Sequence, residues 1–457
     1  MLEKLNDIFL KYQNKIAYIY KDKKLTFGEL FEKAVKISKS LEKGDNSPVI
    51  IFGGKTPEVM AAIIACLIKK RAYVPVDIAF PDERKNKIIA SSGAGTLIDC
   101  SKDNIEIIKT ENGAQNKTKS ETAYMIFTSG STGEPKGVPI SRDNLDNFIN
   151  WITSIEAMNS FEHAFVLNQA AFSFDLSTAA IFYALFGGHA IVQLEDKNDF
   201  DCVFKTIEDK KTEVFVITPT FMRLCLLNND FNEDNYPFVK CLYFCGESLQ
   251  KSLCKKVFER FPDIRIINAY GPTEATSAVC ASEITKEILE HEEFLPCGDI
   301  DSAAVKIYTE DDEIVLKGKS VFCGYLEKTA GGHFTENGEN AYRTGDIGFI
   351  KEGKLYCKGR ADSQIKYKGY RIELSDIESN LSVIDGVESC AVVAKRNPEG
   401  EVRMIKAFVC GKTDSDFIRK SLSEKLPEYM IPKSIKILKN LPVNENGKIN
   451  RKELLNL

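Results

Sequence analysis

Short runs of β-branched and aromatic residues alternate with helix-like segments along most of this chain. Residues 48–52 predict a buried strand, and the apolar residues 57–68 predict the helix that follows it. The same alternation continues with strand signals at residues 164–167, 214–217, 242–244 and 264–267 and a helical pattern at residues 249–261. Repeated β–α alternation favours α/β architecture with layered sheets covered by helices. At roughly 150 residues per domain, a chain of 457 residues suggests about three domains or subdomains.

The character of the sequence changes near residue 360. Ser375 and Glu378 have the spacing of a helix capping box. Further strand signals at residues 390–394, 404–410 and 434–438 surround a helical pattern at residues 414–426. We therefore predict a large N-terminal domain of layered α/β sheets, residues 1–361, and a small α+β domain, residues 362–457.

Composition excludes several functional classes. The net charge of −5 gives no bulk attraction to nucleic acid. The 13 cysteines include no Cys-x-x-Cys pair and the 4 histidines are isolated, so no zinc site is predicted. No signal peptide is seen at the N-terminus, and the longest apolar run, residues 60–68, is too short to span a bilayer. We expect a cytoplasmic protein without membrane insertion.

Residues 128–137 form the strongest local motif, Thr-Ser-Gly-Ser-Thr-Gly-Glu-Pro-Lys-Gly, directly after the apolar run 123–127. Glycines allow the backbone N–H groups of such a loop to approach a phosphate closely. The hydroxyl groups add donors, and Lys136 adds a positive charge. Alone, the segment is also compatible with a mobile polar turn, but a phosphate-bearing ligand is the sharper hypothesis.

Four further blocks follow in order at residues 268–276, 342–346, 359–373 and 446–454. Together with residues 128–137, they resemble the adenylate-forming (AMP-binding) superfamily, and within it the amino-acid-activating domains of nonribosomal peptide synthesis. Residues 71–77, 168–177 and 244–247 resemble the branch that activates D-alanine for a carrier protein. The resemblance runs over nearly the whole chain. It implies ATP-dependent formation of an aminoacyl-adenylate and then transfer to the phosphopantetheine thiol of a carrier protein.

The resemblance implies roles for particular residues. Glu274 corresponds to the Mg²⁺ ligand, Tyr270 to the ring that stacks on adenine, and Asp346 to the carboxylate that accepts the ribose hydroxyls. Lys136 would hold the β- and γ-phosphates, and Lys448 would bridge the substrate carboxylate and the α-phosphate. The implied catalytic residues are thus Lys448, Lys136 and Glu274. The implied nucleotide-binding residues are Thr128, Ser129, Gly130, Ser131, Thr132, Gly133, Lys136, Gly246, Glu247, Asn268, Ala269, Tyr270, Gly271, Thr273, Asp346 and Arg360.

Asp175 resembles the carboxylate that pairs with the α-ammonium group of an amino acid, although an Asp in this context also suits a helix N-cap. The implied substrate-binding residues are Asp175, Leu176, Ala179, Val216, Tyr243, Cys245, Ala269, Ser277, Ala278 and Lys448. Departures from the D-alanine pattern occur at Ala179, Tyr243, Ala269 and Ser277. Ala179 would open space, Tyr243 would fill it, and Ser277 would add a hydroxyl. D-alanine is the leading candidate substrate.

Two positions correspond to moving parts. Asp362 resembles the hinge about which the small domain rotates, and Gly369 resembles the residue that lines the path of the thiol. The chain ends at Leu457, shortly after Lys448, so we expect a separate carrier protein. Residues 363–457 hold 17 Lys and Arg against 13 Asp and Glu, an excess that suits an acidic partner or reflects an uneven solvated surface.

Two other enzymatic readings stay open. One is an acyl- or aryl-CoA synthetase of the same superfamily, whose substrates carry no amino group and do not call for Asp175. The other is a stand-alone adenylation enzyme for a different amino acid in nonribosomal peptide synthesis. A nucleotide-binding module without activity predicts loss of Lys136, Glu274 or Lys448, and all three are present. Elsewhere, Arg71 stands where the family commonly has Gly.

Overall fold

The computed structural model forms two compact units. It describes residues 2–42, 44–102, 104–110, 119, 121–130, 134–326, 331–360, 364–442 and 449–457. The first unit contains Met1–Ile78, Ser92–Ile126 and Gly137–Ala361, and the second contains Ala79–Ser91, Phe127–Lys136 and Asp362–Leu457. The domain boundary predicted between residues 361 and 362 falls outside the described residues and stays a prediction.

The largest sheet of the first unit has eight strands. Their spatial order is β14 (Cys280–Ile284), β13 (Arg265–Tyr270), β12 (Cys241–Phe244), β11 (Val214–Ile217), β9 (Phe165–Asn168), β10 (Ala190–Gln193), β1 (Ile16–Tyr20) and β2 (Lys23–Thr26). The six inner strands are parallel, and the edge strands β2 and β14 are antiparallel to their neighbours. The carboxyl ends of the parallel strands therefore lie along one edge, where α/β sheets commonly bind ligands.

Two more sheets complete this unit. The predicted phosphate-binding segment, residues 128–136, is called the phosphate loop below; it belongs to the second unit together with the adjoining ends of β7 and β8. One of the two sheets has the order β6 (Glu106–Lys109), β5 (Thr96–Asp99), β3 (Val49–Gly53), β4 (Tyr73–Asp77), β7 (Thr122–Thr128) and β8 (Lys136–Ser141). The other has the order β15 (Gly298–Asp299), β20 (Lys354–Arg360), β19 (Glu339–Lys351), β17 (Glu313–Lys317) and β16 (Lys306–Glu310), with β18 (His333–Glu336) paired to β19. The last sheet is antiparallel throughout.

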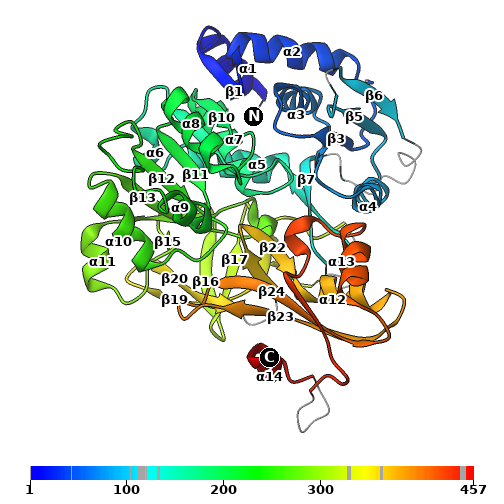
Figure 1. Ribbon diagram of the computed structural model, residues 1–457. Coiled ribbons are helices and arrows are strands. Elements are labelled where there is room, and N and C mark those ends of the chain that lie inside the picture. Colours follow the sequence, from blue (N-terminus) through cyan, green and yellow to red (C-terminus); the bar gives the residue numbers. More distant parts are fainter. Residues whose placement is uncertain are drawn as a thin grey trace. The chain divides into compact units, whose positions relative to one another are not determined.

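Helices cover both faces of the eight-stranded sheet (Figure 1). One hydrophobic cluster unites its first face with α1 (Leu2–Lys11), α2 (Phe27–Lys39), α3 (Pro57–Lys69), α5 (Arg142–Ile152), α6 (Glu156–Asn159) and α7 (Leu176–Gly187). A second cluster unites the opposite face with α8 (Phe200–Lys210), α9 (Pro219–Cys225), α10 (Lys251–Arg260) and α11 (Lys286–His291). Along β12 the alternation is direct, since Tyr243 belongs to the first cluster and Leu242 and Phe244 to the second. The predicted layered α/β fold is confirmed.

Local sequence explains where the predicted elements begin and end. Helix α3 starts after Thr56, whose hydroxyl accepts a hydrogen bond from the N–H of Val59, and Pro57 occupies its first turn. It ends at Lys70, which adopts a left-handed conformation with φ 56°. The helix predicted at residues 57–68 and the strands predicted at β3, β9, β11, β12 and β13 are present, with bounds that differ from the expected ones by three residues at most.

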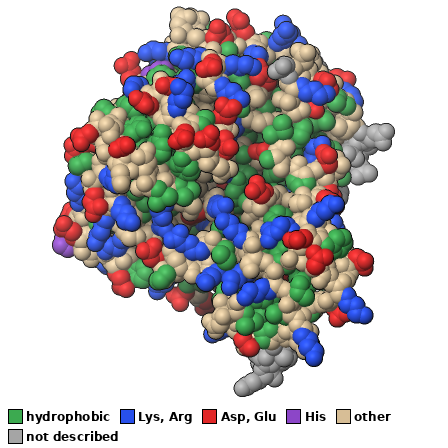
Figure 2. Space-filling model, viewed as in Figure 1, with side chains coloured by type: hydrophobic (Ala, Val, Ile, Leu, Met, Phe, Trp, Pro, Cys, Tyr) green, Lys and Arg blue, Asp and Glu red, His purple; other side chains and the backbone are tan. Residues whose placement is uncertain are grey.

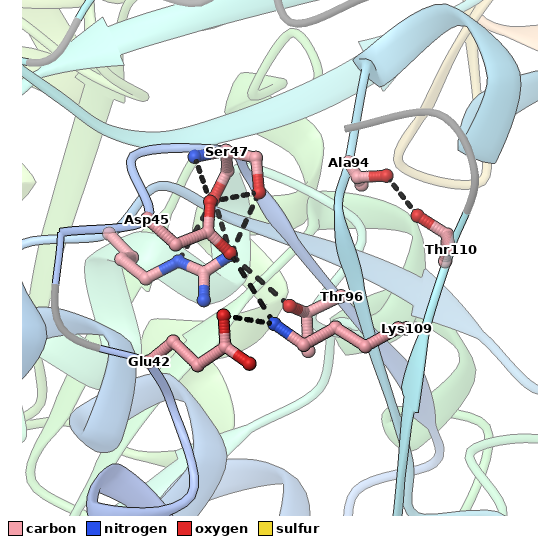
Figure 3. A network of polar contacts seen from close by, with 8 residues as sticks. Glu42, Asp45, Ser47, Ala94, Thr96, Lys109 and Thr110 are labelled. Carbon is pink, nitrogen blue, oxygen red and sulfur yellow. Dashed lines mark hydrogen bonds and ion pairs between the residues drawn. The ribbon is translucent and has the colours of Figure 1, made fainter. Parts of the chain in front are cut away.

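The side chain of Arg71 has a structural role. Its side chain is 2% exposed and donates hydrogen bonds to the carbonyl oxygen of Ser47, to the Ser47 hydroxyl and to the Thr96 hydroxyl. It also pairs with Asp45 at 3.0 Å, and Lys109 joins Asp45 and Glu42 at the rim of this network (Figure 3). Burial opposes ionisation of Asp45, yet the Ser47 hydrogen bonds and both cations lower the pKa of its carboxyl.

The second unit contains a two-stranded and a three-stranded sheet. Its elements are α4 (Asp82–Ser92, of which Ser92 belongs to the first unit), β21 (Gln364–Tyr367), β22 (Tyr370–Glu373), α12 (Leu374–Ser382), β23 (Val387–Arg396), β24 (Val402–Gly411), α13 (Ser415–Ser423), β25 (Ser434–Ile437) and α14 (Arg451–Asn456). The predicted capping box is wrong: α12 begins one residue before Ser375, and its N-cap Glu373 makes no side-chain cap bond. Glu378 instead accepts a hydrogen bond from the N–H of Val392 and pairs with Arg451, because tertiary partners compete successfully for its carboxylate.

Charged side chains of both signs are interspersed over the face that Figure 2 shows. Within the described part of the chain, no helix is both long and apolar enough to cross a lipid bilayer.

Candidate active site

Strand β13 leads into the residues that the sequence assigns to adenine and ribose. Tyr270 is its last residue, and its phenol donates a hydrogen bond to Oδ2 of Asp346 over 2.7 Å. Arg360 donates to Oδ1 of the same carboxylate over 3.0 Å, since Asp346 on β19 and Arg360 on β20 are direct cross-strand partners. The structure thus brings together three residues that are separated by up to 90 positions in sequence. Two donors orient one buried carboxylate, which suits recognition of paired hydroxyl groups.

Burial raises the pKa of the Tyr270 phenol well above its usual value, and the negative charge of Asp346 acts in the same direction. The phenol therefore stays protonated near neutral pH and remains a donor to Asp346. This interaction holds the aromatic ring in a defined orientation at the end of β13.

Glu274 lies in the short 3₁₀ helix Thr273–Ala275 and is 0% exposed. The hydroxyl of Tyr325 donates to its Oε1 over 2.6 Å. Among the described residues, no group of three or more His, Cys, Asp or Glu side chains could hold a metal ion. A single buried carboxylate still fits Mg²⁺, which is commonly held by one or two carboxylates together with substrate phosphates.

Two glycines shape the backbone around this region. Gly246 follows β12 and has a φ of 89°, a conformation that side chains rarely tolerate. A Cβ on Gly271 would lie 2.5 Å from Cα of Ala278, so the two backbone segments approach each other too closely for any side chain. Beside Gly246, the carboxylate of Glu247 accepts a hydrogen bond from the N–H of Thr220 at the start of α9.

Asp175 occupies the N-cap position of α7, but its side chain makes no cap hydrogen bond. Instead, the hydroxyl of Thr273 donates to its Oδ2 over 2.5 Å. The hydroxyl of Ser277 donates to its backbone carbonyl over 2.8 Å. Both contacts link α7 to the loop after β13, so the competing reading of Asp175 as a side-chain helix cap does not describe its interactions.

The proposed pocket wall is assembled from neighbouring strands and the first turns of α7. Val216 on β11 and Tyr243 on β12 are register partners. The wall residues Leu176, Ala179, Val216, Tyr243, Cys245, Ala269 and Ala278 all belong to one hydrophobic cluster. Ser277 has a φ of 74°, and this conformation directs its hydroxyl to Asp175. The hydroxyl that Ser277 was expected to add to the pocket therefore donates to the backbone carbonyl of Asp175.

The phosphate loop belongs to the second unit. Thr128 ends β7, Ser129 and Gly130 follow, and Lys136 begins β8. A Cβ on Gly130 would lie 2.1 Å from the carbonyl oxygen of Glu134, so this position has no room for a side chain. Ser131, Thr132 and Gly133 lie outside the described residues.

Of the remaining predicted residues, the structure describes Gly369 and Asn268 but not Asp362 and Lys448. Gly369 occupies the turn between β21 and β22 with a φ of 82°, which explains the need for glycine there. Asp362 and Lys448 lie outside the described residues, so their predicted roles stay predictions. Asn268 lies on β13, directly before Ala269, and its side-chain amide donates a hydrogen bond to the carbonyl of Pro296 over 2.8 Å.

Sequence reasoning missed Tyr325, the donor to Glu274, and Lys55, whose ammonium donates to the carbonyl of Gln169 over 2.7 Å in the segment leading to Asp175. Neither residue belongs to one of the motifs assigned to the site. Tyr325 is 51 positions from Glu274, and Lys55 is 114 positions from Gln169. Only the fold could reveal these contacts.

The chain belongs to the AMP-binding enzyme family. The family model for AMP-binding enzymes matches residues 7–326, and the model for the AMP-binding enzyme C-terminal domain matches residues 376–448. The first match ends at residue 326, before strands β18, β19 and β20 of the first unit, and the second match covers most of the segment after residue 361.

Comparison with individual proteins identifies relatives within this family. The chain is 37% identical to D-alanine–D-alanyl carrier protein ligase of Bacillus velezensis, covering 95% of this chain and 94% of the relative. It is 36% identical to the protein of the same name in Bacillus licheniformis, over 96% and 95% of the two chains. Among solved structures, the Vibrio cholerae adenylation domain AlmE in complex with glycyl-adenosine-5'-phosphate has a TM-score of 0.85 at 22% identity, covering 99% of this chain and 96% of that chain. The last comparison supports the fold.

Proposed function

We propose that this protein uses ATP to activate a small amino acid as an aminoacyl-adenylate and then transfers it to the phosphopantetheine thiol of a separate carrier protein. The observation that carries the proposal is the Asp175 carboxylate, which accepts a hydrogen bond from Thr273 at the start of α7, whose first turns bury Leu176 and Ala179. The name of the Bacillus relatives makes D-alanine the first candidate substrate.

In the first half-reaction, an oxygen of the substrate carboxylate attacks the α-phosphorus of ATP. A new O–P bond forms, and the bond to the leaving pyrophosphate breaks. The carboxylate is already ionised at neutral pH, so this step needs no general base. It needs two anions held together and the developing charge stabilised, which is a task for cations and N–H donors.

The residues have complementary tasks in this step. Lys448 bridges the substrate carboxylate and the α-phosphate, and Lys136 with the 128–133 loop holds the β- and γ-phosphates. Asp346 and Arg360 bind the ribose side, while Tyr270, Gly246 and Glu247 border adenine. Mg²⁺, held by Glu274, would neutralise phosphate charge.

In the second half-reaction, the thiol attacks the carbonyl carbon of the adenylate. A C–S bond forms, AMP leaves with the electron pair of the broken C–O bond, and the proton of the thiol passes to solvent. Rotation about Asp362 would remove Lys448 and bring Gly369 beside the path of the thiol. The absence of a side chain at Gly369 leaves that path open.

Asp175 discriminates between this function and the alternative of an acyl- or aryl-CoA synthetase. A fatty or aromatic acid carries no cationic group for the Asp175 carboxylate, so its binding would take water from this charge without offering compensation. An amino acid supplies an ammonium group that pairs with it. The other alternative, a different amino acid in nonribosomal peptide synthesis, keeps Asp175 and changes only the side-chain wall.

ATP–pyrophosphate exchange tests the proposal directly. The panel contains D- and L-enantiomers of alanine, serine and larger amino acids, glycine, and simple fatty and aromatic acids. We expect exchange with a small amino acid, D-alanine first. Exchange with fatty or aromatic acids alone would overturn the proposal. Lys448→Ala should nearly abolish exchange while transfer from supplied adenylate survives, and equal loss of both would contradict the two-step assignment.

A further inference from the structure

The phosphate-loop residue Ser129 is hydrogen-bonded to β22 in the second unit. Its hydroxyl donates to the carbonyl of Arg371 over 3.1 Å and accepts from the N–H of Glu373 over 3.0 Å. Ser129 is 6% exposed. One side chain therefore joins the end of β7 to the hairpin formed by β21 and β22, and this hairpin carries Gly369 at its turn.

A second contact joins α4 to the helix that follows the same hairpin. Arg84 on α4 and Asp376 on α12 form an ion pair at 4.0 Å, with side chains 4% and 0% exposed. Oδ1 of Asp376 accepts a hydrogen bond from the Asn380 side chain over 3.1 Å. Within the described residues, Nε of Arg84 and Oδ2 of Asp376 have no hydrogen-bond partner.

This ion pair is suited to reversible contact. Burial of an ion pair contributes little net stability when its geometry is long and its hydrogen bonds are incomplete. If α12 moves away from α4, both charges regain water, so separation costs little. Separating α12 from α4 at this ion pair therefore costs less free energy than separating a packed apolar contact would.

The two contacts are linked through the phosphate loop. Lys87, one turn after Arg84 on α4, pairs with Glu134 of the loop at 3.1 Å. Helix α4, the phosphate loop and the β21–β22 hairpin with α12 therefore form one connected group of interactions. Ser129 and Glu134 of the loop thus contact the hairpin and α4, respectively.

A serine hydroxyl has a single proton to donate. In the observed arrangement, Ser129 donates it to the carbonyl of Arg371. A phosphate oxygen is acceptor-only, so binding it requires the same proton. Ser129 can therefore serve the nucleotide phosphates or the hairpin, but not both at once.

We propose that Arg84 and Ser129 are positioning residues for the thiol-transfer half-reaction, holding the β21–β22 hairpin in place once the phosphates have left the loop. This inference rests on the proposed two-step function. It assigns Asp376 as the partner of Arg84, and it makes departure of pyrophosphate the event that frees Ser129 for the hairpin.

The test measures the two half-reactions separately on the full chain. ATP–pyrophosphate exchange with the best amino acid of the panel reports the first, and transfer from supplied adenylate to free pantetheine reports the second. We expect Arg84→Met to leave exchange within about 2-fold and to slow transfer about 10-fold. Lys85→Met removes the same charge from the same helix and should change neither rate.

A double variant tests the pairing. Arg84→Met combined with Asp376→Leu should lose no more transfer activity than Arg84→Met alone, because the interaction is already absent. Thermal unfolding of each variant, followed by circular dichroism, establishes that it is folded. Equal loss of exchange and transfer in Arg84→Met, or no loss of transfer, overturns the inference. No exchange by the unaltered chain with any amino acid overturns the proposed function instead.

The competition at Ser129 is measured in a Lys448→Ala background, which cannot run the first step in reverse. Added pyrophosphate should slow transfer from supplied adenylate to pantetheine severalfold. Adding Ser129→Ala should lower the basal transfer rate and make it insensitive to pyrophosphate, whereas Ser129→Thr, which keeps the hydroxyl, should retain both. Transfer that is unaffected by pyrophosphate while Ser129 is present contradicts the competition.

Discussion

The hydroxyl of Thr273 donates a hydrogen bond to Oδ2 of Asp175 over 2.5 Å, joining two residues that are 98 positions apart in sequence. The contact links the start of α7 to the loop after β13. The N-terminus of a helix favours a negative charge, and the Thr273 donor fixes the direction of the carboxylate. Asp175 is therefore oriented before any substrate arrives.

Asp175→Asn is the most direct test of substrate recognition. Loss of the charge removes the proposed pairing with the α-ammonium group, which we expect to lower kcat/KM for the amino acid about 10- to 100-fold. The KM for ATP should stay unchanged. Steady-state exchange kinetics with each substrate varied in turn give both values.

The matched control is Asp199→Asn. Asp199 is also the N-cap residue of a helix, α8, but its carboxylate does accept a cap hydrogen bond, from the N–H of Cys202. This substitution should leave exchange kinetics unaltered. If Asp175→Asn behaves like Asp199→Asn, then Asp175 has a structural role alone.

Much of the fold was predictable because local patterns and tertiary structure agree. The apolar segment at residues 57–68 becomes α3, and its Thr56 cap and Pro57 are visible in the sequence. The strand patterns of the parallel sheet are equally clear, because strands buried on both faces are almost entirely apolar. The order of the motifs then identifies the family without any structural information.

The contacts that orient the site were not predictable in the same way. Thr273 donates to Asp175 and Tyr325 donates to Glu274 because of how distant segments pack. The local sequence around these residues does not indicate either hydrogen bond. The capping box at Ser375 failed for a related reason, since Glu378 has a better tertiary partner in Arg451. Local pattern gives residue types near a site, whereas packing decides which atoms meet.

Gly130→Ala should damage the phosphate loop selectively. The new methyl group would lie 2.1 Å from the carbonyl oxygen of Glu134, a backbone atom that cannot move aside cheaply. We expect the KM for ATP in exchange to rise at least about 10-fold, a loss of about 1.4 kcal/mol or more in binding. Gly331→Ala is the control and should leave the kinetics unchanged, because a Cβ there would meet no atom of the described residues within 4 Å. Equal kinetics for the two variants would contradict a tightly constrained loop.

Arg71→Met should destabilise the first unit without changing substrate preference. It removes the buried hydrogen bonds to Ser47 and Thr96 and leaves Asp45 without its guanidinium partner. Loss of these buried hydrogen bonds, together with the partner of the partly exposed Asp45, should cost about 3 kcal/mol, which is readily seen as a lower unfolding midpoint in urea. Lys109→Met removes the exposed cation of the same network and should cost less than about 0.5 kcal/mol. Similar midpoints for both variants would rule out the structural role of Arg71.

His189 should make stability depend on pH in the acidic range. The ring is 2% exposed, its Nδ1 accepts a hydrogen bond from the N–H of Ala164, and it packs on Tyr183. Burial lowers its pKa from 6.5 to about 4, and the nearby His163 acts in the same direction. The folded chain therefore binds fewer protons than the unfolded chain between these values.

The sign follows from proton linkage. Above pH 6.5 the imidazole is neutral in both states and imposes no penalty. As the pH falls from 6.5 to about 4, the unfolded state binds a proton at this imidazole and the folded state does not. The free energy of unfolding therefore decreases by about 3 kcal/mol over this range. Below about pH 4 this contribution levels off. His189→Asn offers an amide oxygen to the Ala164 N–H and has no proton to gain, so its midpoint of unfolding should fall less steeply over this range. The exposed His291→Asn variant should follow the unaltered chain, and parallel pH curves for all three proteins would show that His189 is not the titrating group.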